Sequence, residues 1–341
     1  MTFRSIRFLF PAAIAAALAS THVAGARVVD VSDINGLIKA CQEAQRGDEI
    51  IIAPGTYTLT ERTRISIVKR PGPVTVRGGL GKAAETVIEG QGQDDESVNT
   101  LFDVTDSPGW TFQDFTTRDT FYHGFKFNGG SSGCSLRNVT MRNHGEAGVK
   151  GTSDPDSPAH PDHLVIENCD IGFTRSEGGT RGVVEGVDGV AVKGWIIRGC
   201  RFVNIQKNGG PAYAVFTKGN SMETVIENNR FENCFIGASF GGGGTGAAYF
   251  RDGDSAIEHR GGAIRKNVFI GCTDAAIYIN KGADCDIEGN SMLDCVSHIQ
   301  VRFPQSSARI AGNRVRSNSQ EPLIRTRDGA VILSDELNVR E

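Results

Sequence analysis

Two lysines near the middle of the chain have the spacing expected of an acid–base site. The segment DGVAVK places Asp188 five residues before Lys193, and YAVFTK places Lys218 at the end of the next segment of the same kind. A lysine acts as a general base when its pKa is lowered, and a second ammonium group nearby lowers it. Asp188 and the neighbouring Glu185 carry the oxygen ligands that Ca²⁺ prefers. These residue types suggest proton removal beside a neutralised carboxylate.

The reaction that needs this set of groups is β-elimination on a uronate sugar. A base removes the C5 proton, a cation or positive side chains neutralise the adjacent carboxylate, and the leaving oxygen at C4 takes a proton. We expect Lys193 to be the catalytic base and Lys218 to be its catalytic neighbour. If Lys193 were only an electrostatic contact, His144 in an inserted segment would be the next candidate base.

Two further lysines align with this pair in a recurring block of alternating residues. Lys126 and Lys150 occupy one outward column of the block, and Lys193, Lys218 and Arg302 occupy the next. Like charges stacked on adjacent coils are destabilising unless an anion shares the site, although the lysines could instead fan apart into water. We expect Lys126, Lys150, Arg302 and the nearby Trp195 to bind substrate; packing in the core is the alternative for Trp195. The aligned copies are HGFKFN (123–128), AGVKGT (147–152), DGVAVK (188–193), YAVFTK (213–218), IGASFG (236–241), AAIYIN (275–280) and SHIQVR (297–302).

A second block recurs along the chain with start-to-start spacings of 23 to 38 residues. Its apolar residues alternate as in a strand, and a basic unit near 23 residues indicates a solenoid. Its fourth position is asparagine in the last four copies, and stacked asparagines can hydrogen-bond along the stack. We expect Asn229, Asn267, Asn290 and Asn313 to form one inward ladder. The copies are LRNVTM (136–141), IENCDI (166–171), IRGCRF (197–202), IENNRF (226–231), IRKNVF (264–269), IEGNSM (287–292) and IAGNRV (310–315).

Three of the eight cysteines follow the asparagine column five residues later. Cys234, Cys272 and Cys295 lie in successive units, which predicts a buried column of reduced thiols. Disulfides between stacked coils are the alternative, but parallel strands about 4.8 Å apart are slightly wide for the Cβ separation that a disulfide prefers.

The N-terminal part of the chain predicts an exported protein. Basic residues, a short apolar stretch and AGA at 24–26 are typical of a secretory signal, so we expect residues 1–26 to be removed and the mature protein to be secreted or periplasmic. That stretch is too short for a membrane span, and no other segment comes close. The formal net charge of −4 argues against nucleic acid as a partner. Residues 27–341 are expected to form one domain and a monomer.

The next segment, VSDINGLIKACQEAQRGDEIIIAPGTYTL, predicts a helix over about 32–46 that covers the open end of the stack. This helix, the GDEIIIAPGTYTL segment and the repeated I-x-x-N-x-F turns together resemble exported proteins of the pectate-lyase-like superfamily. The resemblance covers nearly all of residues 27–341. It implies an all-β fold, a right-handed parallel β-helix with an N-terminal capping helix.

A narrower resemblance concerns EGVDGVAVKGW followed by AVFTKGNSMETVIENNRF. This stretch is similar to polysaccharide lyase family 6, the alginate lyase and chondroitinase B group, in which two acids precede a lysine base at a strand end. The resemblance implies that Lys193 is the base, that Asp188 is a calcium ligand, and that Lys218 takes the place of a family arginine. The second acid of the family pattern falls on Gly186, although Glu185 is adjacent.

Three functions therefore remain open at the level of sequence. The favoured one is binding and β-elimination of an acidic, uronate-containing polysaccharide, with Ca²⁺ as a candidate cofactor. The second is a non-catalytic carbohydrate-binding or cell-surface protein on the same scaffold. The third is a glycoside hydrolase, which needs two carboxylates about 5–10 Å apart, and Asp188 with Glu185 is the pair available for it.

Overall fold

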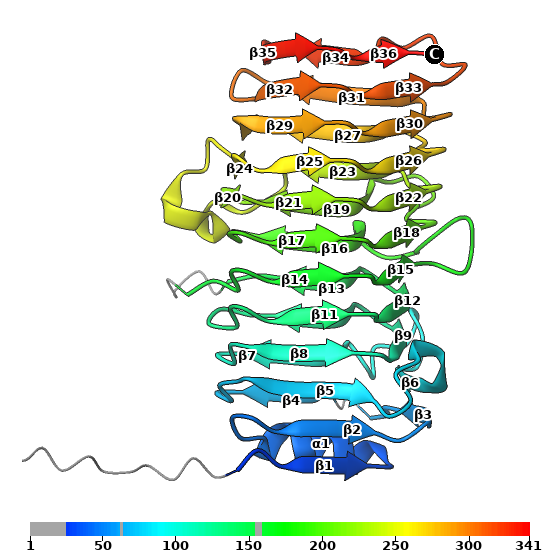
Figure 1. The fold of residues 1–341 in the computed structure, drawn as a ribbon, viewed down its shortest axis with the longest axis vertical. Coiled ribbons are helices and arrows are strands. Elements are labelled where there is room, and N and C mark those ends of the chain that lie inside the picture. The colour runs from blue at the N-terminus through cyan, green and yellow to red at the C-terminus, as the bar shows by residue number, and fades with distance from the viewer. Residues whose placement is uncertain (1–24, 62–63, 154–158) are drawn as a thin grey trace, which may run out of the picture.

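The computed structural model describes residues 25–61, 64–153 and 159–341. These residues form one tall stack of coils, with the N-terminal coils at one end and the C-terminus at the other (Figure 1). The predicted signal segment, 1–26, lies outside the described residues except for its last two positions. In the described part of the chain, no helix is long and apolar enough to cross a membrane.

Three long sheets run the length of the stack, and every strand pairing printed for them is parallel. Within the described ranges they hold 12, 10 and 11 strands and are called sheets 1, 2 and 3. Sheet 1 consists of β1 (Val28–Val31), β2 (Glu49–Ile52), β5 (Val74–Gly78), β8 (Trp110–Gln113), β11 (Ser135–Arg137), β14 (Val165–Glu167), β17 (Ile196–Arg198), β21 (Val225–Glu227), β25 (Ala263–Arg265), β29 (Cys285–Glu288), β32 (Ser307–Ala311) and β35 (Val331–Glu336). Sheet 2 consists of β4 (Ile65–Val68), β7 (Thr100–Thr105), β10 (His123–Phe127), β13 (Ala147–Gly151), β16 (Val184–Val190), β19 (Ala212–Lys218), β23 (Ile236–Phe240), β27 (Ala275–Asn280), β31 (Ser297–Arg302) and β34 (Ile324–Arg327). Sheet 3 consists of β3 (Gly55–Thr58), β6 (Thr86–Glu89), β9 (Thr116–Thr120), β12 (Thr140–His144), β15 (Asp170–Gly172), β18 (Arg201–Val203), β22 (Arg230–Glu232), β26 (Val268–Ile270), β30 (Ser291–Leu293), β33 (Arg314–Arg316) and β36 (Val339–Arg340). A small sheet pairs β20 (Ser221–Met222), β24 (His259–Arg260) and β28 (Gly282–Ala283) beside them.

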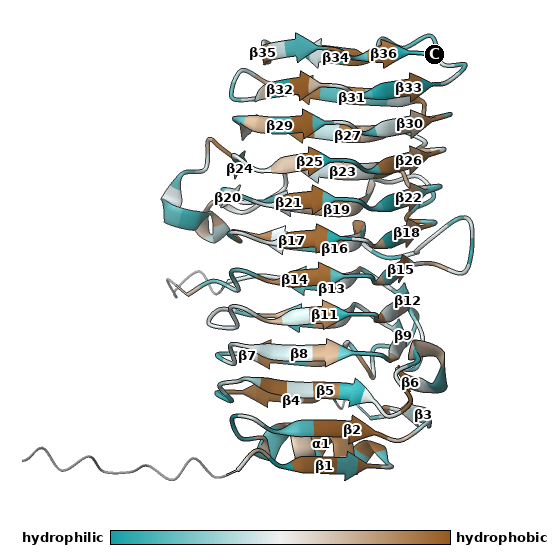
Figure 2. Cartoon of the chain, viewed as in Figure 1, coloured by the Kyte–Doolittle hydropathy of each residue, from teal (hydrophilic) through white to brown (hydrophobic). Residues whose placement is uncertain are grey.

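The core lies inside the coils, where equivalent positions stack on one another. The central isoleucine of the sheet 1 strands is fully buried in β17, β21 and β25, and Figure 2 shows the apolar segments of these strands one above another. In sheet 3, Phe202, Phe231 and Phe269 stack with ring centroids 4.9 and 4.6 Å apart. Each such side chain contributes about 1.5–3 kcal/mol by leaving water, so one repeated position supplies a large part of the folding energy.

The single α-helix of the described residues lies in the first coil (Figure 1). Helix α1 spans Ile34–Glu43, a shorter range than the predicted 32–46. Asp33 caps it: the Asp33 carboxylate accepts a hydrogen bond of 2.8 Å from the Gly36 amide. Leu37 and Cys41 are buried against the first strands. The role of α1 as a cap and the right-handed sense of the coil stay predictions.

The predicted asparagine ladder is confirmed and continues one step further. The side-chain amide of Asn229 donates to Asn267 at 3.1 Å, Asn267 to Asn290 at 3.0 Å, and Asn290 to Asn313 at 2.9 Å. Asn313 donates in turn to Asn338 at 2.9 Å. The ladder occupies the corner between sheets 1 and 3, so each repeated block is two short strands that flank a bend rather than one strand.

Removal of one asparagine of the ladder should lower the free energy of unfolding, because its buried hydrogen-bond partners cannot form replacement hydrogen bonds with water. Asn267 accepts from both the backbone and the side-chain nitrogen of Asn229 and donates to the Ile226 carbonyl. Asn267→Ala should therefore lower the free energy of unfolding by about 3 kcal/mol, measured by urea denaturation. Asn338→Ala, at the partly exposed end of the ladder, is the control and should cost about 1 kcal/mol or less. Equal effects at the two positions would contradict this account.

The cysteine column is buried as expected. Cys234, Cys272 and Cys295 are at most 1 % exposed, and all eight cysteines of the chain are free. The column fills the interior beside the asparagine ladder, where a small apolar side chain fits.

Candidate functional site

The register of sheet 2 differs from the predicted one in a single strand. Lys126 of β10 pairs with Lys150 of β13, as expected, but Lys150 pairs with Asp188 of β16, and Asp188 pairs with Phe216 of β19. Lys218 consequently pairs with Val190 and not with Lys193. The predicted adjacency of Lys193 and Lys218 is wrong, because β16 ends three residues earlier than the sequence suggested.

The error has its origin in a local repeat within β16. EGVDGV and DGVAVK both show the same x-Gly-Val pattern three residues apart, so either frame matches the neighbouring copies. In the fold, Ala191 adopts a left-handed φ of 58° and ends the strand. Gly186 then takes the position where a Cβ would lie 2.4 Å from the Ala214 carbonyl and 3.0 Å from the Phe202 ring. Either frame places a glycine at this position, so the tight contact is satisfied in both and does not by itself distinguish them.

This register brings two lysines onto one buried carboxylate. The Lys150 ammonium is in direct contact with Asp188 Oδ2, and the Lys218 ammonium lies 3.9 Å from the same oxygen. The Asp188 side chain is fully buried, whereas 17 % of Lys150 and 14 % of Lys218 is exposed. The buried Asp188 carboxylate therefore lies on the inner side of the two ammonium groups, and the ammonium groups lie on its outer side.

Two further acids, Glu146 and Glu185, complete the cluster around Asp188. Glu146, in the turn before β13, places Oε1 3.7 Å from Lys150 Nζ and 3.6 Å from His123 Nε2. Glu185 is 3 % exposed, and burial, followed by the charge of Asp188, raises its pKa well above the usual range. Burial lowers the pKa of Lys150, but Asp188, Glu185 and Glu146 together raise it above its ordinary value. Lys150 is thus a fixed positive charge near neutral pH.

His123 and Glu146 form a coupled pair at the edge of the cluster. Burial lowers the pKa of His123 despite its contact with Glu146. Burial opposes ionisation of Glu146, but His123 and Lys150 prevail and lower its pKa to about 2. The sequence did not assign a catalytic or binding role to either residue: His123 begins the first copy of the block, and Glu146 directly precedes the second.

An aromatic surface lies beside Lys218. The Lys218 ammonium is 4.3 Å from the centroid of the Phe216 ring, and Tyr213 stacks on that ring at 4.2 Å. A Cβ on Gly242 would lie 2.1 Å from the same ring, so only glycine lets this part of the chain pass over Phe216. The ammonium group is therefore oriented by an aromatic face as well as by Asp188.

The structure separates other predicted site residues from this cluster. Lys193 is 37 % exposed, forms a bridge with Met222, and places its ammonium 3.4 Å from Glu223. Arg302 lies on β31, three strands beyond β19, and pairs with Asp328 at 2.5 Å.

Two candidates prove to be core residues. Trp195 is fully buried and donates its indole N–H to the Pro161 carbonyl at 2.6 Å, so the expected contact with a sugar is wrong. His144, the alternative base, is 3 % exposed and is hydrogen-bonded by the hydroxyls of Thr117 and Thr120 at 3.1 and 2.7 Å. Burial lowers its pKa to about 3.

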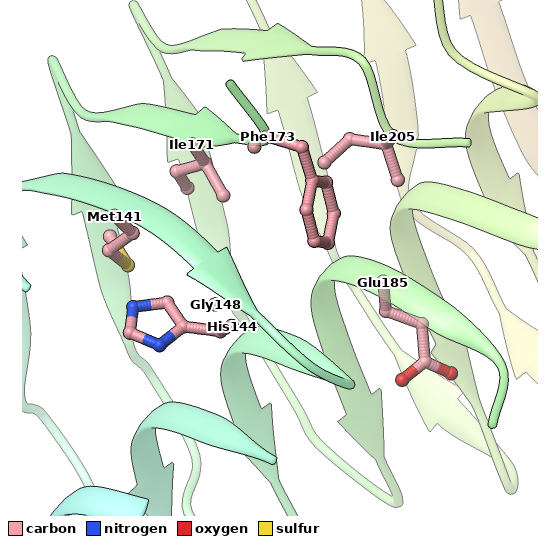
Figure 3. A pocket seen from close by; sticks show the side chains of 8 residues that line it. Met141, His144, Gly148, Ile171, Phe173, Glu185 and Ile205 are labelled. Atoms are coloured by element: carbon pink, nitrogen blue, oxygen red, sulfur yellow. The ribbon is translucent and has the colours of Figure 1, made fainter. Parts of the chain in front are cut away.

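Glu185 and His144 also line a small internal cavity with room for about one water molecule. Figure 3 shows His144 beside Met141 on one side of this cavity and Glu185 on the other, with Ile171, Phe173 and Ile205 around it. One oxygen of Glu185 and one of Asp188 have no hydrogen-bond partner among the residues that the structure describes. The inner side of the cluster is thus closed off, and its accessible side is the outward face of sheet 2.

Two long loops lie on either side of that face (Figure 1). The 173–183 loop is tied to the 91–98 loop, where Arg181 donates to the Gln93 carbonyl and lies 3.8 Å over the Phe121 ring. The 241–258 loop is tied to the end of β19 by the buried Glu258, which accepts a hydrogen bond of 2.8 Å from the Gly219 amide. Long loops therefore frame the lysine-bearing strands.

The residues around Asp188 and Glu185 do not fit the expected calcium site. Within the described residues, no group of three or more His, Cys, Asp or Glu side chains is arranged to hold a metal ion. Lys150 and Lys218 lie at the Asp188 oxygen that a cation would use. The lysines supply positive charge where calcium was expected to supply it.

Solved structures with the same fold belong to proteins that act on polysaccharides. An alginate lyase from Paenibacillus sp. str. FPU-7 is 16 % identical with a TM-score of 0.53, over 89 % of this chain and 98 % of that one. An endo-xylogalacturonan hydrolase from Aspergillus tubingensis is 11 % identical with a TM-score of 0.59, over 90 % and 93 %. A family 6 alginate lyase is 17 % identical with a TM-score of 0.50, over 85 % of this chain but 38 % of the lyase.

No protein-family model matches the sequence, and no curated protein matches it significantly. At these identities the solved structures establish the fold, and the residues of the site must be judged on their own geometry. The chain has a parallel β-helix fold, which these solved structures share, and its likeness to the family 6 alginate lyase is distant.

Proposed function

We propose that the protein binds an acidic polysaccharide across the outward face of β10, β13, β16 and β19 and cleaves it by β-elimination. The observation that carries the proposal is the gathering of Lys126, Lys150 and Lys218 on this face, two of them held by the buried Asp188, in a chain of net charge −4. A uronate polymer is the ligand whose repeated carboxylates suit such a row of ammonium groups.

The three lysines have different roles in the proposed reaction. Lys150 stays protonated, and together with Lys126 it neutralises the uronate carboxylate. Lys218 makes the looser contact with Asp188 and is the base: as a neutral amine it takes the C5 proton. The electron pair of the C5–H bond forms the C4=C5 double bond, the C4–O bond breaks, and the leaving oxygen takes a proton from the new Lys218 ammonium.

The comparisons support this reading at the level of the scaffold. The fold is shared with lyases and a hydrolase that act on polysaccharides, and the ligand-facing loops are the long ones. We further propose that the protein is secreted or periplasmic after removal of residues 1–26, and that it works as a monomer.

A panel of acidic polymers tests the proposal directly. The purified protein is incubated with alginate, pectate and glycosaminoglycans, and the absorbance band of unsaturated uronates is followed together with the release of reducing ends. A rise in both signals on one polymer is expected. Reducing ends without the absorbance band would point to hydrolysis instead. Binding without any product would favour a carbohydrate-binding protein.

The hydrolase alternative has one observation in its favour. Burial raises the pKa of Glu185 well above its usual range beside Asp188, and a raised pKa is what the general acid of a glycoside hydrolase needs. Both side chains are at most 3 % exposed, however, and the lysines cover Asp188. A sugar would have to displace Lys150 to reach them, so β-elimination is the better-supported reaction.

Removal of divalent cations should leave the activity unchanged. Because Lys150 and Lys126 neutralise the uronate carboxylate in this mechanism, excess EDTA is expected to change the initial rate on the active polymer by less than about twofold, at constant ionic strength. Added calcium should likewise leave the melting temperature unchanged, because a ligand raises the melting temperature only when it binds the folded protein. If EDTA abolishes the activity and added calcium restores it, Asp188 and Glu185 are metal ligands and this prediction is wrong.

A further inference from the structure

Two tyrosines stand out from the other aromatic residues of the described chain because their rings are exposed. Tyr122 is 38 % exposed and Tyr249 is 44 % exposed, whereas all other aromatic side chains in the described ranges are buried or half-buried. Both flank the lysine-bearing face: Tyr122 precedes β10, and Tyr249 belongs to the loop that follows β23.

Tyr122 is held next to the acidic edge of the cluster. Its carbonyl accepts hydrogen bonds from the amides of Glu146 at 2.9 Å and Ala147 at 3.1 Å. Its ring meets the Phe121 ring edge to face at 4.5 Å and lies 5.8 Å from the His123 ring, which in turn contacts Glu146. The exposed ring is therefore fixed at the N-terminal end of the sheet 2 strands. His123 lies between this ring and Glu146, which contacts Lys150.

Tyr249 is held at the opposite end of the strands, beside Lys218. It closes the short helix η2 (Ala247–Tyr249) in the 241–258 loop. The residue after Lys218 is Gly219, whose carbonyl accepts the Arg251 amide at 2.9 Å; a Cβ on Gly219 would lie 3.3 Å from the Tyr249 carbonyl. The Arg251 guanidinium also donates to the Ala191 carbonyl at 3.0 Å. The loop is thus pinned to β16 and β19 while it leaves the tyrosine ring in solvent.

We propose that Tyr122 and Tyr249 are sugar-stacking platforms at the two ends of one binding face, and that the ligand is an acidic oligosaccharide long enough to reach both. The inference rests on the binding half of the proposed function. From β10 to β19 there are three strand spacings, about 14 Å, and the seven residues of β19 extend about 23 Å, so the polymer crosses the lysines diagonally over several sugar units.

The two kinds of contact have different physical signatures. Attraction between lysines and uronate carboxylates is screened by salt. Packing of the apolar face of a sugar ring on a tyrosine ring is a desolvation effect that salt does not screen, and a ring already held by its neighbours loses little conformational entropy on binding. The lysines therefore select an acidic polymer, and the tyrosines select its length.

The experiment measures the affinity of alginate- and polygalacturonate-derived oligosaccharides of graded length, by titration calorimetry at low and high salt. Tyr122→Ala and Tyr249→Ala should each weaken binding of the longest oligosaccharides about threefold to tenfold, by the same factor at both salt concentrations, and leave the shortest unaffected. Tyr122→Phe and Tyr249→Phe should bind like the wild type, because the ring and not the hydroxyl makes the contact. Leu80→Ala, at a 58 % exposed residue between β5 and β6, is the control.

The outcomes separate this inference from the proposed function. If the wild type binds the oligosaccharides and the alanine variants bind them equally well, or if their defect disappears at high salt, the tyrosines are not platforms and only this inference fails. If the wild type binds none of the acidic oligosaccharides, the proposed function fails with it.

Discussion

Lys218→Ala is expected to lower the turnover number on the active uronate polymer by about a hundredfold or more, with a much smaller change in KM. General base catalysis contributes about 10²–10⁴ to the rate, and that contribution is lost with the amine. In the proposed function the uronate carboxylate is bound by Lys126 and Lys150, and the substitution leaves both in place. The measurement is a set of initial rates from unsaturated-uronate absorbance as a function of polymer concentration.

Three companion variants sharpen the result. Lys218→Arg should be as slow as the alanine variant, because a guanidinium keeps its proton near neutral pH. Lys39→Ala, at an exposed lysine on α1, controls for the loss of one positive charge and should leave the rate unchanged. Lys193→Ala should keep most of the activity, since Lys193 lies beside Glu223 and Met222 rather than on the lysine-bearing face. Normal turnover in Lys218→Ala would show that Lys218 is not the base, and loss of turnover in Lys193→Ala would make Lys193 the candidate base again.

Asp188→Asn is expected to be the most destabilising change in the site. The Asp188 side chain is fully buried between Lys150 and Lys218, so its neutralisation leaves two ammonium groups without their shared counter-charge. Removal of one partner from a buried ion pair costs about 3–5 kcal/mol, and urea denaturation would measure this loss. Asp254→Asn is the matched control: it breaks the exposed pair with Arg260 and should cost at most about 1 kcal/mol.

A double variant distinguishes a lost ion pair from a damaged strand. If the cost in Asp188→Asn comes from an uncompensated ammonium, adding Lys150→Met should recover part of it, because the second substitution removes the stranded charge. If the two substitutions simply add, the effect of Asp188 is on packing in β16. A single Asp188→Asn variant as stable as the wild type would show that water or a bound anion, and not Asp188, balances the charge of the two lysines.

The repeat architecture follows from the sequence because a stacked coil presents each position to its own counterpart. The side-chain amide of a ladder residue such as Asn267 hydrogen-bonds the asparagine side chains of the coils above and below, so the repeat of asparagine in the sequence predicts the ladder. The same rule placed Lys126 beside Lys150, since the blocks that carry them match without ambiguity. The position of Lys218 relative to Phe216 was predictable on the same ground.

What the tertiary structure alone decided is which residues meet around Asp188. The Gly-Val repeat in β16 leaves two equivalent frames, and the fold adopts the one that ends the strand at Ala191 and carries Asp188, not Lys193, to the lysines. The contacts of Glu146 with Lys150 come from a turn outside the repeated block, so no alignment of blocks reveals them. Burial of Trp195 likewise depends on a carbonyl more than thirty residues away. A periodic sequence pattern specifies which residues stack within a sheet. Charged and aromatic side chains on turns and loops lie outside that pattern, so their positions depend on how the coils pack against one another.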